Sequence, residues 1–155
     1  MNMRTWPTDW DDRRAGINCP TCGQGRPEET RGGLRFLAGD VVDAYLRKSA
    51  PQPGYAIAVW RGRHVPDLVD LSPEELASYW TEVTTAARAL YEVYPPAQLN
   101  YLTYGNSVPH LHTYLLCRYL DDPAPGLPLA PFVERPVEIA ELMRRITQLK
   151  AAVRP

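Results

Sequence analysis

The stretch from Asn100 to Tyr119 constrains this chain most, because two of the chain's three histidines lie two residues apart within it. His110 and His112 stand in a run of leucine, aromatic and β-branched residues, which is typical of a β-strand. Strand side chains alternate between the two faces of a sheet. His110, His112 and Tyr114 would therefore share one face, each about 6.6 Å from the next.

The segment just before these histidines is typical of a turn that binds an anion. Gly105, Asn106 and Ser107 favour tight turns, and such a turn can present backbone N–H groups and a hydroxyl to a phosphate. From the residues alone, two interpretations stay open. Either the histidines and the turn form a phosphate-handling site, or they are satisfied side chains in an ordinary strand and turn.

Composition limits the possible classes of protein. The 155 residues suffice for one domain with a packed core, and the net charge of −1 gives no bulk attraction to nucleic acid or membrane surfaces. No apolar stretch approaches the ~20 residues of a membrane span, and the first residues lack the apolar segment of a signal peptide. With three cysteines, a disulfide framework is not expected. We therefore expect a cytoplasmic protein that binds neither nucleic acid nor membrane.

A Cys-x-x-Cys pair lies near the start of the chain. Cys19 and Cys22 have the spacing with which two thiolates hold one metal ion, but a redox pair has the same spacing. A zinc ion needs two further ligands. His64 and His110 are the other thiolate or imidazole side chains in suitable places.

The order of apolar patterns predicts an α+β fold with an antiparallel sheet of about five strands. Residues 1–18 are expected to form an irregular N-terminal arm before a single domain at 19–155. The predicted elements are a hairpin at 34–46 that turns at 39–40, a central strand at 55–60, a long helix at 72–94, a strand at 98–104, the histidine strand, a proline-rich loop at 121–136 and a C-terminal helix at 138–153.

The long helix has a clear start signal. Ser72 can cap the helix, Pro73 suits the first helical position, and Glu75 completes a capping box. Helical spacing then predicts which side chains face the core. In the long helix these are Leu76, Trp80, Val83, Ala87 and Leu90, and in the C-terminal helix they are Ile139, Leu142, Met143, Ile146 and Leu149.

In combination, these motifs resemble the histidine-triad (HIT) superfamily. Its motif of alternating histidines follows a Gly-Gln/Asn-Ser/Thr-Val segment, and residues 105–116 have this form with Tyr114 in place of the third histidine. The basic turn that ends in His64 and the Asp-Leu-Ser-Pro-Glu-Glu segment at 70–75 also match. The similarity covers roughly residues 19–120. It implies the HIT sheet with a long central helix and a C-terminal helix, and a homodimer.

The resemblance also implies a metal site. One branch of the superfamily, like the related galactose-1-phosphate uridylyltransferases, holds zinc with a Cys-x-x-Cys pair, the histidine of the basic turn and the first histidine of the motif. Carried over to this sequence, the ligands would be Cys19, Cys22, His64 and His110. A Cys₂His₂ set leaves no open coordination position, so the zinc ion would be structural.

The second histidine of the family motif is the nucleophile, which makes His112 the expected catalytic residue. Its neutral imidazole would attack the α-phosphate of a nucleoside phosphate derivative, and water or another acceptor would remove the nucleotidyl group. Tyr114 would donate a hydrogen bond to the phosphate or the leaving group. Ser107, Asn106 and Asn100 would contact the substrate. The implied activity is that of a nucleotide hydrolase or nucleotidyltransferase, of the phosphoramidase or dinucleoside polyphosphate hydrolase type.

Two departures from the family pattern keep alternatives open. Tyr114 cannot readily carry a positive charge at neutral pH, although the uridylyltransferases have glutamine there and remain active. A non-catalytic or weakly active nucleotide-binding protein with a structural zinc site, or a purely structural zinc protein, is the alternative. Arg47 stands where the family has a ribose-binding carboxylate. Either a shifted register brings Asp43 to the sugar, or the sugar is recognised differently. Arg47 itself would then be a solvated surface side chain or a contact for an additional phosphate.

Overall fold

The computed structural model describes residues 5–128 and 133–154 of the chain. The helices are α1 Trp10–Arg14, α2 Pro20–Gln24, α3 Pro73–Val93 and α4 Ile139–Ala152, with a 3-10 turn at Leu68–Asp70. The strands are β1 Gly33–Ala38, β2 Val42–Arg47, β3 Ser49–Ala50, β4 Tyr55–Trp60, β5 Gln98–Thr103, β6 His112–Arg118 and β7 Arg135–Pro136. No helix in these two ranges combines the length and the apolarity that a membrane crossing requires.

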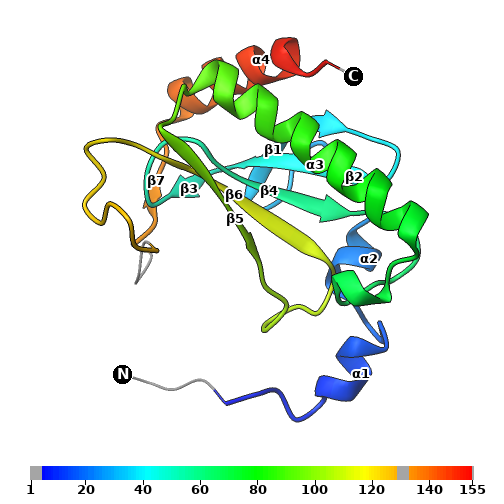
Figure 1. The fold of residues 1–155 in the computed structure, drawn as a ribbon. Coiled ribbons are helices and arrows are strands. Elements are labelled where there is room, and N and C mark those ends of the chain that lie inside the picture. The colour runs from blue at the N-terminus through cyan, green and yellow to red at the C-terminus, as the bar shows by residue number, and fades with distance from the viewer. Residues whose placement is uncertain (1–4, 129–132, 155) are drawn as a thin grey trace.

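Five strands form one antiparallel sheet in the order β1-β2-β4-β6-β5. Helices α3 and α4 lie together over one face of it, and α1 and α2 lie near the end where β6 begins (Figure 1). The predicted α+β fold with about five antiparallel strands is confirmed. A separate two-stranded ribbon forms where residues 135–136, in the segment predicted to be a proline-rich loop, pair with residues 49–50, for which no element was predicted.

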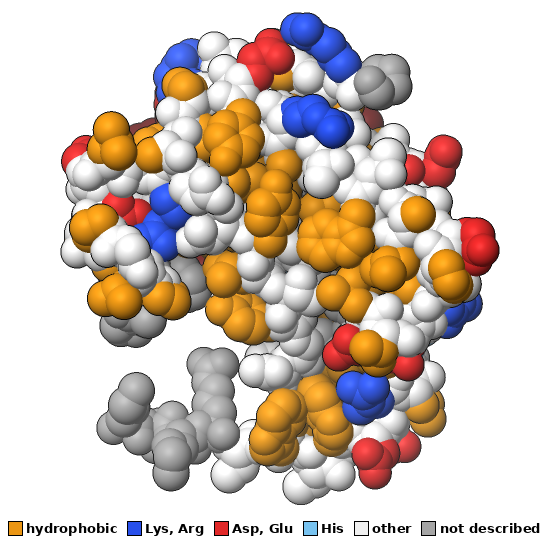
Figure 2. All heavy atoms as spheres, viewed as in Figure 1, with side chains coloured by type: hydrophobic (Ala, Val, Ile, Leu, Met, Phe, Trp, Pro, Cys, Tyr) orange, Lys and Arg blue, Asp and Glu red, His pale blue; other side chains and the backbone are white. Residues whose placement is uncertain are grey.

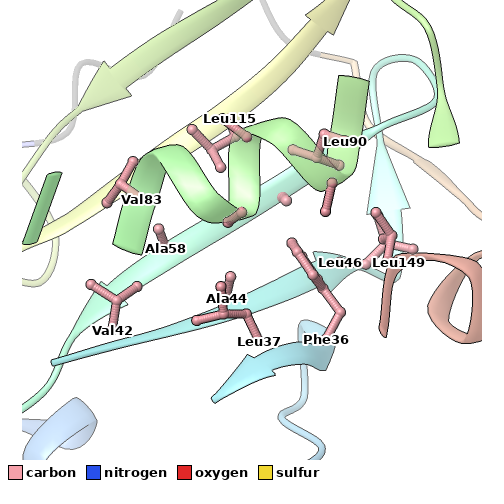
Figure 3. Close-up of a cluster of buried hydrophobic side chains, with 14 of the residues drawn as sticks. Phe36, Leu37, Val42, Ala44, Leu46, Ala58, Val83, Leu90, Leu115 and Leu149 are labelled. Carbon is pink, nitrogen blue, oxygen red and sulfur yellow. The ribbon is translucent and has the colours of Figure 1, made fainter. Parts of the chain in front are cut away.

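The main core lies between the sheet and helix α3. Val83 and Leu90 of α3 lie among side chains of the sheet that include Ala58 and Leu115, and all four are fully buried (Figure 3). Alanines on β2 and β4 leave room for the helix to approach closely. The core-facing side chains of β6 are those at odd positions, so its even positions, including His112, lie on the opposite face.

Local signals define helix α3 as predicted. Ser72 and Glu75 form the capping box, and Pro73 is the first helical residue. The carboxylate of Glu82 accepts hydrogen bonds from the backbone N–H groups of residues 40–42 at distances of 2.7–3.0 Å, with Val42 the closest. This contact joins the middle of α3 to the turn between β1 and β2.

Three side chains predicted to face the core are exposed instead. Leu76 is 36% exposed, Ile139 77% and Met143 52%. Helix α4 packs against α3 and β1 through the narrower stripe of Leu142, Ile146 and Leu149. Ile139 lies in the first turn, outside this contact, and Met143 lies one position off the stripe.

The N-terminal arm is partly helical rather than irregular. It contains α1, whose Trp10 meets Trp6 edge-on with ring centroids 4.6 Å apart. Cys19 is the N-cap of α2 and Cys22 lies within it, so the Cys-x-x-Cys pair occupies the first turn of a short helix. This local geometry turns both sulfur atoms to the same side.

Candidate functional site

Four predicted metal ligands meet at the end of the sheet where β6 begins. The ligand atoms of Cys19, Cys22, His64 and His110 all lie within 4.8 Å of one another. His110 Nδ1 is 3.5 Å from both sulfur atoms, and His64 Nδ1 is 3.5 Å from the Cys22 sulfur. A tetrahedral zinc ion with ordinary Zn–S and Zn–N distances would put sulfur and nitrogen about 3.5 Å apart. The cluster therefore has the dimensions of a zinc site.

The other nitrogen of each histidine ring fixes its tautomer. His64 Nε2 is 3.2 Å from the Arg14 carbonyl oxygen, and His110 Nε2 is 2.8 Å from the Trp60 carbonyl oxygen. Because a carbonyl only accepts, both Nε2 atoms carry a hydrogen and both Nδ1 lone pairs face the cluster. Burial lowers the pKa of His110, which keeps the ring neutral as metal ligation requires.

The same kind of contact orients His112. Its Nδ1 lies 2.7 Å from the His110 carbonyl oxygen, so Nδ1 donates the hydrogen and Nε2 keeps its lone pair. Burial lowers the pKa of His112, the hydrogen bond to the His110 carbonyl opposes that shift, and the charge of Arg47 adds to it. The imidazole is therefore neutral at neutral pH, the state in which it can act as a nucleophile.

A pocket of about 420 Å³ opens in front of His112. Its lining combines the turn before β6 with the even face of that strand: Tyr104, Asn106, Ser107, Val108, His112 and Tyr114. A larger cavity of about 940 Å³ lies near the C-terminal end of α3, but its lining has no histidine or cysteine. The smaller pocket thus unites an imidazole with the turn that suits an anion.

Tyrosines surround the nucleophile candidate on this face. The Tyr114 ring meets His112 edge-on at 5.3 Å and stacks on Tyr55 at 5.4 Å with an angle of 16°. Tyr104 lies 6.4 Å from Tyr114. Burial raises the pKa of Tyr114, so its phenol stays protonated and can donate a hydrogen bond at neutral pH.

Asn100 is not brought together with the other predicted substrate contacts. It pairs with Leu116 on the same face as His112, but its amide oxygen accepts a hydrogen bond of 2.7 Å from Arg118. Arg118 also bonds Asp122 and two carbonyls of the following loop, which fixes that loop against the sheet. Asn100 therefore belongs to this structural network.

Asp43 is bonded to arginines inside the fold and cannot contact a sugar. It is fully buried, and its carboxylate accepts from Arg26 at 2.7 and 3.0 Å and from Arg61 at 2.9 Å. This ion cluster attaches the segment after α2 to the sheet. Of the two alternatives for sugar recognition, a shift that exposes Asp43 is wrong.

Sequence reasoning missed two side chains near the pocket. Side chains alternate along a strand, so Tyr104 lies on the same face as Asn100, and it comes directly before the turn. This alternation would have predicted its position near the pocket. Glu134 lies beside Arg47, and the distance between Glu134 Oε2 and Arg47 Nη2 is 3.7 Å. No local pattern connects two residues so far apart in sequence.

Residues 35–120, more than half of the chain, match the family model described as HIT domain. The chain belongs to the HIT domain family. No protein in the search of curated proteins matched the sequence. HIT domain proteins are associated in general with nucleotide binding and with hydrolase or transferase activity, and membership in the family supports an activity of this general kind.

Solved structures of HIT proteins share the fold. A histidine triad protein from Bradyrhizobium japonicum is 24% identical with a TM-score of 0.70, over 79% of this chain and 92% of the other. One from Marinobacter aquaeolei is 21% identical with a TM-score of 0.69, over 79% and 89%. A zinc-bound histidine triad family protein from Mycobacterium smegmatis is 19% identical with a TM-score of 0.65, over 88% and 94%.

We expect Asp43→Asn to weaken folding and leave nucleotide binding intact. Breaking a buried ion pair from one side costs about 3–5 kcal/mol, because the guanidinium groups of Arg26 and Arg61 lose their counter-charge. Urea denaturation measures this loss, with Asp40→Asn on the exposed hairpin turn as the matched control. A nucleoside monophosphate should bind the folded variant with unchanged Kd. A tenfold weaker Kd without loss of stability would contradict the structural role.

Proposed function

We propose that this protein is a nucleotide hydrolase or nucleotidyltransferase that acts through His112. The observation that carries the proposal is the orientation of this imidazole. Its Nδ1 donates to the His110 carbonyl, and the ring lines the pocket that also contains Asn106 and Ser107. A neutral, oriented imidazole beside an anion-binding turn suits attack on phosphorus.

In the first step, Nε2 of His112 forms a bond to the α-phosphorus of a nucleoside phosphate derivative. The bond between phosphorus and the leaving group breaks, and the leaving group takes a proton. The Ser107 hydroxyl and the Tyr114 phenol are the donors beside the reacting atoms, and backbone N–H groups of the turn stabilise the phosphate charge.

In the second step, water or another acceptor attacks the phosphorus of the nucleotidyl-histidine. The P–N bond breaks and the electron pair returns to Nε2. The acceptor loses its proton to solvent or to a pocket base. Transfer to water makes the protein a hydrolase, whereas transfer to another nucleophile makes it a nucleotidyltransferase.

The alternative is a nucleotide-binding protein with little or no turnover. The presence of Tyr114 supports it, since a phenol with a raised pKa is a weaker acid than an imidazolium. The two proposals differ in turnover, not in binding. Turnover measured on a panel of substrates distinguishes them. The panel consists of adenosine phosphoramidate, nucleotidyl-lysine and dinucleoside polyphosphates.

We predict that His112→Asn lowers kcat on the best substrate of that panel by about 10³-fold or more, while Kd for the nucleoside monophosphate product changes little. Tyr114→Phe should lower kcat by about 10–100-fold, because one proton donor is lost. Tyr91→Phe, exposed on α3, is the control for the loss of a phenol.

Turnover that survives His112→Asn would remove this residue as the nucleophile. Nucleotide binding with no turnover of any panel member by the unmodified protein would leave the non-catalytic alternative.

We also propose that the Cys₂His₂ cluster holds a structural zinc ion. The support is the ligand spacing, the two carbonyl acceptors behind the rings, and the zinc-bound relative from Mycobacterium smegmatis. With four protein ligands the ion would join α2 to the turn after β4 and to the start of β6. It would supply cross-linking and no open position for a substrate.

Elemental analysis should find about one zinc per chain in purified protein. Cys22→Ser should remove most of it, because a hydroxyl is a poor zinc ligand, and should lower the melting temperature. Cys117→Ala, outside the cluster, should keep the metal and serves as the control. Purified protein with no bound zinc, and with a melting temperature that a strong chelator leaves unchanged, would contradict the site.

We propose that the protein forms a homodimer through α3 and β5. Strand β5 is a sheet edge, and no charged residue lies on it, whereas monomeric proteins usually protect such edges. Tyr101 of β5 is 43% exposed and meets Trp80 of α3 edge-on, and Leu76 is exposed on the same helix. Apolar side chains gather around α3 and β5 on this side of the molecule (Figure 2).

Tyr101→Asp should convert the dimer to a monomer, because it buries a charge at the sheet edge. Sedimentation equilibrium of the full chain measures the change in mass. Ser78→Asp is the control, since helical spacing puts Ser78 on the side of Glu82. A monomeric unmodified protein, or a dimer unaffected by Tyr101→Asp, would contradict this interface.

The proposed setting is the cytoplasm, where reducing conditions keep the three thiols available. We propose that residues 19–155 form one HIT-like domain that follows the 1–18 arm.

A further inference from the structure

The N-terminal arm lies beside the turn that precedes His110, where helix α1 approaches the loop between β5 and β6 (Figure 1). A cavity of about 360 Å³ lies between the arm and this turn, and Ser107, Val108 and Pro109 form its wall on the side of the turn. Ser107 and Val108 also line the pocket in front of His112. The turn therefore contacts both the arm and the proposed active site. The arm precedes residues 35–120, so the match to the HIT domain does not include it.

Arg13 joins the arm to this turn. Its Nη1 donates a hydrogen bond of 3.4 Å to the Ser107 carbonyl oxygen, and its Nε donates one of 2.9 Å to Asp9 Oδ1. Asp9 is the N-cap of α1 and lies four residues before Arg13, a spacing that brings two helical side chains together. The carboxylate therefore orients the guanidinium, and the positive charge of this donor strengthens its long hydrogen bond to the turn.

The backbone N–H groups of the turn are available to a ligand. Within the part of the chain that the structure describes, the N–H groups of Asn106, Ser107 and Val108 have no hydrogen-bond partner. A trans peptide unit is planar, so its C=O and N–H groups point in opposite directions. The Ser107 carbonyl and the Val108 N–H belong to one peptide unit. Because Arg13 binds the carbonyl, the Val108 N–H points away from the arm.

The charge of Arg13 acts on the same peptide unit. A cation at a carbonyl oxygen polarises the peptide and makes the N–H group at its other end a stronger hydrogen-bond donor. Turns that bind anions do so through N–H groups held in a fixed direction. A phosphate at this turn would therefore bind more tightly when Arg13 holds the Ser107 carbonyl than when the peptide unit is free to rotate.

The position of Arg13 indicates an indirect role. Among the described residues, those that line the pocket in front of His112 do not include Arg13, whereas the cavity on the side of the arm does have it in its wall. The residues that both spaces share, Ser107 and Val108, belong to the turn. Arg13 can therefore act on a ligand beside His112 through the turn, without touching the reacting atoms.

A second contact fixes the arm directly after Arg13. The carbonyl oxygen of Arg14 accepts a hydrogen bond of 3.2 Å from His64 Nε2. Gly16 has a φ of 83°, and a Cβ built on it would lie 2.7 Å from His64 Cγ. Both the positive φ and the close approach require glycine. The imidazole of His64 therefore holds the segment that carries Arg13 at a set distance from the turn.

We propose that Arg13 is a positioning residue, which fixes the Ser107–Val108 peptide unit so that its N–H group faces the phosphate of the substrate. The inference rests on the proposed function, since it assigns a residue that supports phosphate binding beside His112. It makes the N-terminal arm a part of the proposed active site. The ligand that depends on Arg13 is a nucleoside phosphate, because only the phosphate meets the turn.

Calorimetric titration of the full chain with a nucleoside 5′-monophosphate and with the same nucleoside tests the proposal. We expect Arg13→Gln to weaken binding of the monophosphate about 3–10-fold, because the phosphate loses one oriented donor. The Kd of the nucleoside should stay the same, since it has no phosphate, whereas a general loss of structure would weaken both ligands. The amide resonance of Val108 in an NMR spectrum should shift, because its peptide unit loses the cation at the carbonyl.

The neighbouring arginine provides a matched control. The side chain of Arg14 is 43% exposed and that of Arg13 is 42% exposed, but Arg14 Nη2 lies 3.8 Å from Asp70 and not at the turn. Arg14→Gln removes the same charge and should leave both Kd values and the Val108 resonance unchanged. Arg13→Lys keeps a charged donor and should recover part of the affinity that Arg13→Gln loses. Circular dichroism checks that each variant is folded.

Three results would overturn the positioning role and leave the proposed function standing. They are an unchanged monophosphate Kd or Val108 resonance in Arg13→Gln, equal weakening of the monophosphate and the nucleoside in that variant, and an equal loss of monophosphate affinity in Arg14→Gln. The last result would indicate general electrostatic attraction. If the unmodified protein binds no nucleotide at all, the proposed function fails, and the role of Arg13 fails with it.

Discussion

The position of β6 between two antiparallel neighbours is the constraint on which the site depends. β4 and β5 fix its register from both sides, so each side chain of β6 has a determined face. Thr113 is fully buried, and its hydroxyl shares hydrogen bonds of 2.8 Å with Tyr79 of α3 and Thr103 of β5. A slip by one residue would bury His112 among apolar side chains and expose Leu115.

His110 connects the Cys₂His₂ cluster to the candidate nucleophile. Its ring faces the two cysteines and His64, while its carbonyl oxygen accepts the hydrogen of His112 Nδ1. Anything that fixes the His110 backbone therefore also fixes the tautomer of His112. This double contact gives a physical reason why the proposed zinc ion would matter for the proposed chemistry of His112, although the ion would have no contact with the substrate.

Strand β2 carries two charged residues, Asp43 and Arg47, on the same face of the sheet as His112. Asp43 is surrounded by arginines and attaches the N-terminal segment to the sheet. Arg47, four residues later on the same face, has an Nε without a hydrogen-bond partner among the described residues and lies at ion-pair distance from Glu134. Asp43 is therefore fully bonded within the fold, whereas Arg47 has an incomplete set of partners among the described residues.

The sequence by itself determined the elements that depend on near neighbours in the chain. The capping box of α3, the hairpin turn, the alternation around His112 and the Cys-x-x-Cys spacing follow from residues a few positions apart. The complete set of four metal-ligand candidates came from the family resemblance. Only the tertiary structure decided that Asn100 accepts a hydrogen bond from Arg118 and that Asp43 is buried in an ion cluster. It also decided that Met143 is exposed and that Glu134 lies beside Arg47. Such contacts join segments far apart in the chain, and their geometry is set by the packing of the whole fold rather than by any local period.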